Sequence, residues 1–333
     1  MAMWKITSGR GSRLTDQFLD RNCVAIGWRE VGDYTASASR DDLIVRFANA
    51  YPDKTSKQVS VIANQAWRFL RAVEIGDDVI VYDPPNRKYA IGKISSAPTY
   101  RPDAISVLPV MRSVEWKGFV NRDDLSQKTK NSLGAIMALF KVPDECHLEI
   151  LGGPDPAGAN NELVDLLEAE DQPSKLDSFD GLAELALERI KDRLTNLTWD
   201  EMQEMVAALL RALGYRTQVS PAGPDRGKDI VASRDGFGFE PPRIVVEVKH
   251  RPKQPMGAPE IRAFLGGRHA EDRGLYVSTG GFTREAHFEA ERASTVTHLM
   301  TLDDLASSIV ENYDSLDARG RILLPLQKLY WPV

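Results

Sequence analysis

Two acidic residues and a lysine in the C-terminal half of the chain are of the types and spacing that could cleave a phosphodiester bond. Asp229 begins a short β-type run, and Glu247 and Lys249 stand two residues apart in a later one. Side chains two apart on a strand point to the same face, so Glu247 and Lys249 face the same way. If the two strands pair, Asp229 can lie beside them.

This set of residues suits hydrolysis assisted by a hard divalent cation. Mg²⁺ (or Mn²⁺) takes oxygen ligands of the kind that the Asp229 and Glu247 carboxylates offer. The carbonyl of Val248, which lies between Glu247 and Lys249, could be a further ligand, and waters and a substrate phosphate would complete the shell. The cation would polarise the phosphoryl oxygens and lower the pKa of a bound water. Lys249 would orient that water or stabilise the charge that develops on the phosphate.

An acidic residue and a lysine at this spacing can also be an ordinary solvent-facing pair, and the residues before Asp229 can be a simple turn. The order of the surrounding elements favours the catalytic interpretation. A helical pattern starts near Gly181 and breaks at Thr195-Asn196. A second helix is predicted over Thr198–Leu213, with Thr198 and Glu201 at capping-box spacing and Gly214 as its end signal.

The elements expected after that helix alternate between strands and helices, which is an α/β layered order. The predicted strands are Tyr215–Val219, Asp229–Ser233, Arg243–Lys249, Gly274–Ser278 and His298–Leu302, and the predicted helices are Pro259–Gly267, Thr283–Ala293 and Leu302–Tyr313.

Several spaced motifs in this half resemble the Mrr catalytic domain, a branch of the PD-(D/E)XK nuclease superfamily. They are Leu213-Gly214-Tyr215, Asp225-x-Gly227-x-Asp229, Glu247-Val248-Lys249 and the segment from Ser278 to Ala286, and the likeness covers about Leu197 to Leu305. The resemblance implies a restriction-endonuclease-like α/β/α core with a catalytic Asp229, Glu247 and Lys249. Many similar proteins carry Gln at the position of Glu247.

The resemblance also implies a glutamate on the helix that precedes these strands. Gln203 stands at the aligned position and Glu204 beside it, so Glu204 is the further catalytic candidate, and which of the two takes that place is open. Charged residues flanking the motifs could contact the DNA backbone or could equally be a solvated surface. These candidates are Arg226, Lys228, His250, Arg251 and Lys253.

The N-terminal half is rich in short β-type runs bounded by Gly, Pro and Asn, which predict a small mixed barrel. The runs are Trp4–Ile6, Cys23–Trp28, Asp78–Tyr82, Tyr89–Ile94 and Ser106–Val110, and helices are expected over Arg40–Ala50 and Lys57–Val73. The turn Asp83-Pro84-Pro85-Asn86 is expected to connect a hairpin.

This half resembles the EVE and PUA-like barrels, which read modified bases in nucleic acid. The matching pieces include Trp4-Lys5-Ile6, Asn22–Trp28, Ile75–Ile80, Ala90–Ile94 and Val110–Trp116. An extruded base needs aromatic faces to stack on and polar groups along its edge. The candidates are Trp28 as the pocket wall, then Tyr82 and Trp67, with Asp83 and Ser113 as edge readers; the aromatic residues could instead belong to the core.

Composition limits the remaining possibilities. The 333 residues carry a net charge of −6, and acidic residues concentrate between Asp144 and Asp180. Two distant cysteines predict neither a disulfide framework nor a zinc site. No apolar run reaches the roughly 18–20 residues of a membrane span, and no secretory signal is visible, so a cytoplasmic location is expected. We expect a recognition domain over residues 1–150, an acidic linker over 151–180 and an endonuclease domain over 181–333.

Together these expectations describe a modification-dependent, type IV-like restriction endonuclease that would bind double-stranded DNA with a modified base and cut nearby. One site per chain predicts a homodimer for a double-strand cut. No membrane partner and no nucleotide cofactor are expected. Two alternatives stay open: a non-catalytic protein that binds modified nucleic acid, and a nuclease acting on RNA or single strands. The sequence leaves open which base modification is read.

Overall fold

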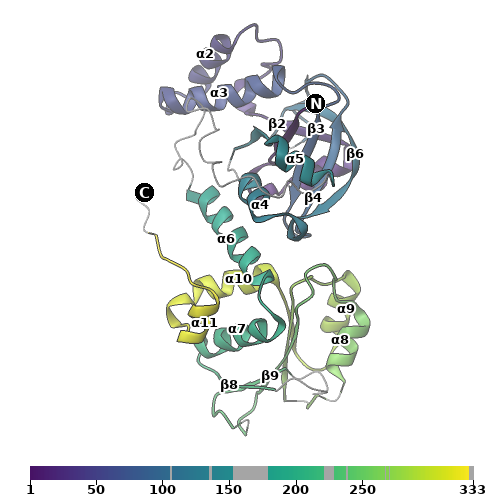
Figure 1. Ribbon diagram of the computed structural model, residues 1–333, viewed down its shortest axis with the longest axis vertical. Coiled ribbons are helices and arrows are strands. Elements are labelled where there is room, and N and C mark those ends of the chain that lie inside the picture. Colours follow the sequence, from purple (N-terminus) through teal and green to yellow (C-terminus); the bar gives the residue numbers. More distant parts are fainter. Residues whose placement is uncertain are drawn as a thin grey trace. The chain divides into compact units, whose positions relative to one another are not determined.

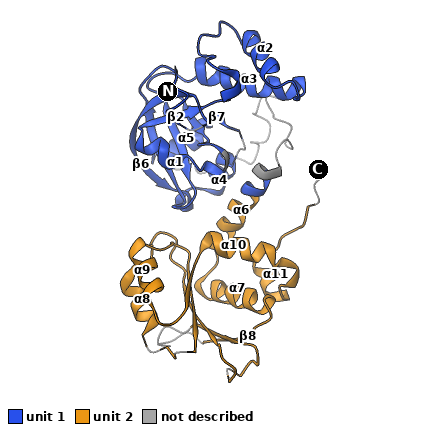
Figure 2. Ribbon diagram, turned by 180° about the vertical axis from the view of Figure 1, so that it is seen from behind, with its two compact units in different colours: residues 1–185 blue, residues 186–333 orange. Residues whose placement is uncertain are grey.

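The chain folds as two units, Met1–Leu185 and Ala186–Val333 (Figure 2). The computed structural model describes residues 1–105, 107–134, 137–152, 179–220, 229–237, 239–266, 268–269 and 271–329. Most of the predicted linker, residues 151–180, lies outside these ranges. Within the described ranges, no helix has both the length and the apolar character that a membrane crossing requires.

Unit 1 is built around a seven-stranded curled sheet. Its strand order is β2 (Cys23–Ile26), β6 (Val110–Asn121), β4 (Lys88–Ile94), β3 (Asp78–Asp83), β1 (Met3–Ile6) and β7 (Leu139–Lys141), with β5 (Thr99–Tyr100) also on β6. Among the described strands, β2 and β7 end this order and do not pair with each other. The sheet is therefore a half-barrel, and the closed PUA- or EVE-like barrel that we expected is not formed.

Helices cover the two faces of this sheet separately. Along β3, Val79 and Val81 enter one core cluster with α2 (Arg40–Ala50) and α3 (Ser56–Arg71). Ile80 and Tyr82 enter a different cluster with α4 (Gln127–Leu133) and α5 (Asp144–Ile150). This alternation follows from the two-residue period of a strand. The remaining elements of unit 1 are α1 (Thr15–Asp20) and three short 3-10 helices, Arg10–Ser12, Arg29–Val31 and Arg122–Asp124.

Unit 2 holds a five-stranded sheet. Its order is β12 (Thr297–Thr301), β11 (Arg273–Ser278), β10 (Ile244–Lys249), β9 (Ile230–Ser233) and β8 (Arg216–Val219). The strands β8, β9 and β10 pair antiparallel, whereas β10, β11 and β12 pair parallel. Every strand predicted for this half is present, with ends that differ by at most one residue.

Helices form a layer on each side of this second sheet, as Figures 1 and 2 show. One layer holds α7 (Trp199–Ala212), α10 (Leu302–Glu311) and α11 (Ala318–Leu323), and the other holds α8 (Ala258–Leu265) and α9 (Arg284–Arg292). The first helix, α6 (Phe179–Thr195), ends where the break was predicted. Helix α7 starts with the expected capping box, in which Thr198 accepts from the Glu201 N–H and Glu201 from the Thr198 N–H.

Some elements were missed or misplaced by the sequence patterns. The strand predicted over Ser106–Val110 begins only at Val110, after Pro109, which has no backbone N–H to donate to a sheet. It then runs for 12 residues and pairs with β2, β4 and β5. The short helices α4, α5 and α11 were not predicted, because six or seven residues give too little periodicity to detect.

Candidate active site

Strand β10 presents two different faces at its carboxyl end. Val246 and Val248 enter the core beneath α7. By the two-residue period, Glu247 and Lys249 point to the opposite face, where α8 and α9 lie. The parallel register places Glu247 beside Tyr276 and Lys249 beside Ser278 on β11.

Asp229 is held directly against this part of β10. Its N–H donates to the Val246 carbonyl at 2.9 Å, and its carboxylate Oδ2 accepts the Val248 N–H at 2.6 Å. Ile230 is the antiparallel partner of Val246, so Asp229 stands opposite Glu247. Asp229, just before β9, and Glu247 of β10 therefore lie side by side, and we call these two residues the carboxylate row.

Both carboxylates of the row are buried, and a lysine neutralises one of them. Asp229 is 4% exposed and Glu247 is 8% exposed. The Lys249 ammonium lies 2.6 Å from Glu247 Oε1, and its side chain is 30% exposed. Two buried negative charges side by side are costly unless they are paired or bind a cation. Lys249 therefore stabilises the buried Glu247 carboxylate, while its own side chain stays partly exposed to solvent.

The donor set of the row fits a hard divalent cation. The Val248 N–H points toward β9 and Asp229, and in a strand the carbonyl of a residue points to the same side as its N–H. The Asp229 carboxylate and the Val248 carbonyl thus lie on the same side of β10, and the register places Glu247 next to Asp229. Within the described ranges, no group of three or more His, Cys, Asp or Glu side chains is arranged to hold a metal. Mg²⁺ needs only one or two carboxylates from the protein, since waters and phosphates fill its remaining positions.

Three further charged or polar residues, which the sequence did not indicate, surround the row. The pKa of Tyr276 is raised by burial and then by the negative charges of Glu247, Glu260 and Asp229, while Arg251 opposes this rise. Burial lowers the pKa of Arg268, and the charge of Glu247 opposes that effect. Glu260 on α8 and Arg268 after it are therefore close enough to act on the row, although each lies at least 13 residues from Glu247 in the chain.

The two candidates for the helix carboxylate, Gln203 and Glu204, lie on α7. Gln203 is buried, and its Nε2 has no hydrogen-bond partner among the described residues. Glu204 instead pairs with Arg211 at 2.6 Å and with Arg319 at 3.8 Å. Both residues belong to the helix that covers the face of the sheet opposite Glu247. Which of the two takes the family's helix position, and whether it acts in catalysis, stays a prediction.

The predicted backbone contacts are placed unevenly. Arg251 and Lys253 follow β10 and are exposed. His250 is half-buried, with Nε2 at 2.7 Å from the Leu197 carbonyl, so it is less accessible to a DNA strand than we expected. Arg226 and Lys228 lie outside the described residues. The contact of these five residues with DNA stays a prediction.

The five predicted base-binding residues of unit 1 do not come together. Trp28 and Trp67 pack against the core cluster under α2 and α3, where Trp28 meets Phe47 edge-on at 5.1 Å. Tyr82 lies in the cluster on the other face of the sheet. Asp83 is buried and accepts from Asn86, and Ser113 is exposed on β6. A single pocket made of all five is therefore wrong, because neighbouring positions of a strand point to opposite faces.

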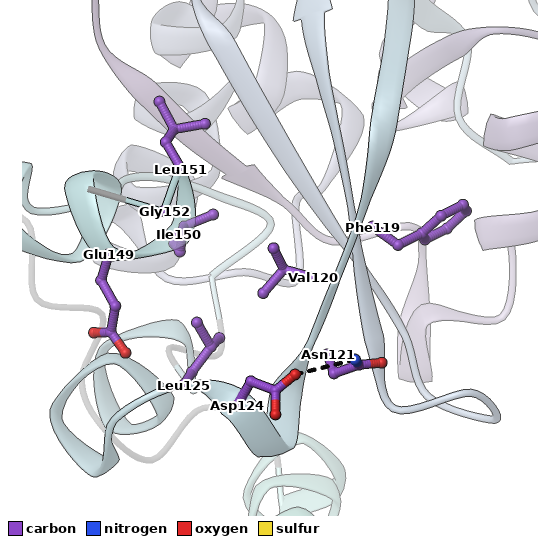
Figure 3. A pocket seen from close by; sticks show the side chains of 9 residues that line it. All are labelled: Phe119, Val120, Asn121, Asp124, Leu125, Glu149, Ile150, Leu151 and Gly152. Carbon is purple, nitrogen blue, oxygen red and sulfur yellow. Dashed lines mark hydrogen bonds between the residues drawn. The ribbon is translucent and has the colours of Figure 1, made fainter. Parts of the chain in front are cut away.

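A hollow of about 390 Å³ lies elsewhere in unit 1, between β6 and α5 (Figure 3). Val120, Leu125 and Ile150 point toward its interior, and Asn121 donates to Asp124 at its rim. Glu149, which also lines it, accepts from Thr129 and Ser126 on the neighbouring helix start. Among the described residues, two carboxylates and no cation line this hollow, which disfavours phosphate binding there. None of the five predicted base-binding residues lines it.

The comparisons with known proteins separate the two halves of the chain. Residues 194–309 match the Mrr catalytic family, described as restriction endonuclease. Unit 2 thus carries a restriction-endonuclease-like domain, and the resemblance noted from its motifs is confirmed. Residues 4–139 match a domain of unknown function (DUF8426). The expected EVE or PUA-like identity of unit 1 is therefore not confirmed.

Matches to individual proteins are partial. An "Uncharacterized protein y4cE" of Sinorhizobium fredii (strain NBRC 101917 / NGR234) is 32% identical over 128 residues, which are 38% of this chain and 32% of that protein. The chain thus spans about a third of the length of this curated relative. The solved structure "MspJI Restriction Endonuclease in Complex with 27-mer Oligonucleotide" aligns with a TM-score of 0.33 at 13% identity, over 92% of this chain and 72% of that one. "DNA modification-dependent restriction endonuclease AspBHI" aligns with a TM-score of 0.33 at 14% identity, over 79% and 72%. TM-scores this low do not establish a common fold.

Proposed function

We propose that unit 2 is a Mg²⁺-dependent endonuclease that hydrolyses phosphodiester bonds in double-stranded DNA at Asp229, Glu247 and Lys249. The observation that carries this proposal is the carboxylate row itself. Two buried carboxylates, Asp229 and Glu247, lie side by side at β9 and β10. Lys249 lies on the same face of the sheet, two residues after Glu247. The row lies inside the segment that matches a restriction endonuclease family.

Asp229, Glu247 and the Val248 carbonyl would hold the cation. A divalent cation in this position supplies Lewis-acid polarisation of the phosphoryl oxygen and a water of lowered pKa. The Val248 N–H fixes the Asp229 carboxylate by donating to Oδ2, so this ligand is oriented before a substrate arrives. Pre-oriented ligands lose little conformational entropy on binding.

Lys249 is the residue that meets the substrate. An ammonium group has three N–H donors, so the contact with Glu247 leaves donors for a phosphate oxygen or the attacking water. Its partial exposure gives it access to a strand that approaches from solvent. Positive charge placed where negative charge develops on the phosphate stabilises the transition state.

For the whole chain we propose a modification-dependent restriction endonuclease in which unit 1 recognises a modified base and the nuclease unit cuts nearby. The support for this part is that a separately folded unit of 185 residues accompanies the nuclease unit. The base pocket is proposed around Trp28 and Trp67, which share one core cluster and are both half-buried. A homodimer would supply the second site for a double-strand cut.

The test is cleavage of matched plasmids, unmodified or carrying 5-methylcytosine, its oxidised forms or N6-methyladenine, with Mg²⁺ and with EDTA. Cutting of one modified plasmid only, abolished by EDTA, would support both parts of the proposal. Equal cutting of all plasmids would keep the nuclease and reject the reader. Selective binding without any cutting would favour the non-catalytic alternative, and preferential cutting of RNA or single strands would favour the other one.

A further inference from the structure

A second row of polar groups lies on β11, beside the carboxylate row. Tyr276 is the register partner of Glu247, and Ser278 is the partner of Lys249. Both side chains are fully buried, at 0% exposure. Their hydroxyl oxygens have no hydrogen-bond partner among the described residues. A buried hydroxyl without a partner is costly and calls for an explanation, of which a role in a nearby site is one.

The ring of Tyr276 is held in one orientation. Phe264 of α8 meets it edge-on, with ring centroids 5.2 Å apart, and Phe282 meets it edge-on at 5.9 Å. Edge-to-face contacts on two sides fix the ring plane, and with it the direction of the hydroxyl. The charges of Glu247, Glu260 and Asp229 all act on this hydroxyl, so it lies within the electrostatic reach of the carboxylate row.

The backbone at the end of β11 is also clamped to the site. The Thr279 N–H donates to the Lys249 carbonyl at 3.1 Å. Gly280 comes so close to the loop after β10 that an added Cβ would lie 2.3 Å from the Arg251 and Gln254 carbonyl oxygens. Neither β10 nor β11 can therefore shift alone, and the spacing between Glu247 and Tyr276 is fixed.

We infer that Tyr276 is a positioning residue of the cleavage site, whose hydroxyl donates to the Glu247 carboxylate when that carboxylate binds the cation. In the structure described here Lys249 occupies Glu247 Oε1. A cation bound at Glu247 would compete with this contact, and the Tyr276 hydroxyl is a buried donor on the same face that would keep the carboxylate oriented. Groups that orient a metal ligand in this way change metal affinity or activity by roughly 10- to 100-fold when they are removed.

This inference rests on the proposed function, and direct metal titration separates the two. Mn²⁺ binding to the full chain without DNA is measured by electron paramagnetic resonance for the native protein, Asp229→Asn, Tyr276→Phe and Tyr34→Phe. Tyr34 is a matched control, because it is also fully buried, its hydroxyl also has no partner among the described residues, and it lies in unit 1.

We expect Tyr276→Phe to weaken Mn²⁺ binding roughly 10-fold or more, while Tyr34→Phe leaves it unchanged. Neither variant should lower the melting temperature, since each removes only an unpaired buried hydroxyl. Native affinity in Tyr276→Phe, with binding lost in Asp229→Asn, would overturn the inference and keep the proposed function. Absence of Mn²⁺ binding in the native chain would overturn both.

Should Tyr276→Phe unfold, Ser278→Ala tests the same row one period further on. The expected result is a cleavage rate at least 10-fold lower with unchanged melting temperature, because the hydroxyl next to Lys249 would be lost. A native cleavage rate in Ser278→Ala would then overturn the assignment of this row to the site.

Discussion

Asp229 has two roles in this account, and two substitutions at that position separate them. Its carboxylate accepts the buried Val248 N–H at 2.6 Å and is also proposed to hold the cation. Asp229→Asn keeps an oxygen that can accept the N–H but removes the charge. Asp229→Ala removes both, and leaves the Val248 N–H buried without a partner.

The expected magnitudes follow from these contacts. An orphaned buried N–H costs about 1–3 kcal/mol. For a unit of about 150 residues, each kcal/mol shifts the melting temperature by roughly 2–4 °C, so Asp229→Ala should melt roughly 2–12 °C lower. Asp229→Asn should stay within about 1 kcal/mol of the native chain, because the hydrogen bond is kept and repulsion from Glu247 is relieved. Both should lose about 4 kcal/mol of transition-state stabilisation, which is roughly a 10³-fold drop in rate.

The assay combines thermal unfolding in EDTA with single-turnover cleavage in Mg²⁺. Measuring stability in EDTA keeps the loss of cation binding out of the comparison. Cleavage by Asp229→Asn within tenfold of the native rate would refute the proposed role of this carboxylate. Equal melting temperatures for the Ala and Asn variants would instead refute the structural role assigned to its contact with Val248.

Three other predictions follow from the same contacts. Lys249→Met should lower the cleavage rate at least 100-fold, whereas Lys328→Met, at an exposed lysine that pairs with Asp314, should change it less than threefold, as single-turnover rates can show. Glu204→Gln should lower the free energy of unfolding by about 1 kcal/mol or less, because it weakens the partly exposed pair with Arg211, and it should retain cleavage. A loss of cleavage rate as large as that of Asp229→Asn would instead place Glu204 in the site. Burial raises the pKa of Glu149, but hydrogen bonds from the start of α4 lower that pKa overall. The ionised Glu149 carboxylate therefore stabilises the fold fully above the unfolded pKa of about 4.3. This stabilisation is lost as the pH falls through the lower pKa of the folded state. Native protein should therefore be more stable than Glu149→Gln at pH 7, and the two melting curves should converge at acidic pH; a gap that persists there would contradict this.

The nuclease half could be predicted well from the sequence, because its signals are local and repeated. The capping box at Thr198 and the two-residue spacing of Glu247 and Lys249 each specify geometry over a few residues. Their order along the chain then allowed the layered fold to be expected. What could not be predicted were contacts between distant segments, such as the placement of Tyr276 beside Glu247 across two parallel strands.

The N-terminal half shows the limit of the same reasoning. The strands β1 to β4 were predicted, but β5, β7 and most of the long β6 were not. Whether a sheet closes depends on which strands pair at its edges, and β7 is one of those edges. The five residues predicted to bind a base do not form one pocket, for a related reason. Tyr82 and Trp28 were chosen by residue type, and the sheet places them in separate core clusters.

The most direct test of the central claim is the Mg²⁺-dependent cleavage rate of Glu247→Ala compared with that of Glu240→Ala, because Ala removes the oxygen ligand whereas Gln would keep one. The two glutamates lie seven residues apart, but Glu247 is buried in the carboxylate row and Glu240 is exposed in the loop before β10. We predict a loss of roughly 10³-fold for Glu247→Ala and a native rate for Glu240→Ala. Native cleavage by Glu247→Ala, or equal losses in both variants, would contradict the proposed role of this carboxylate.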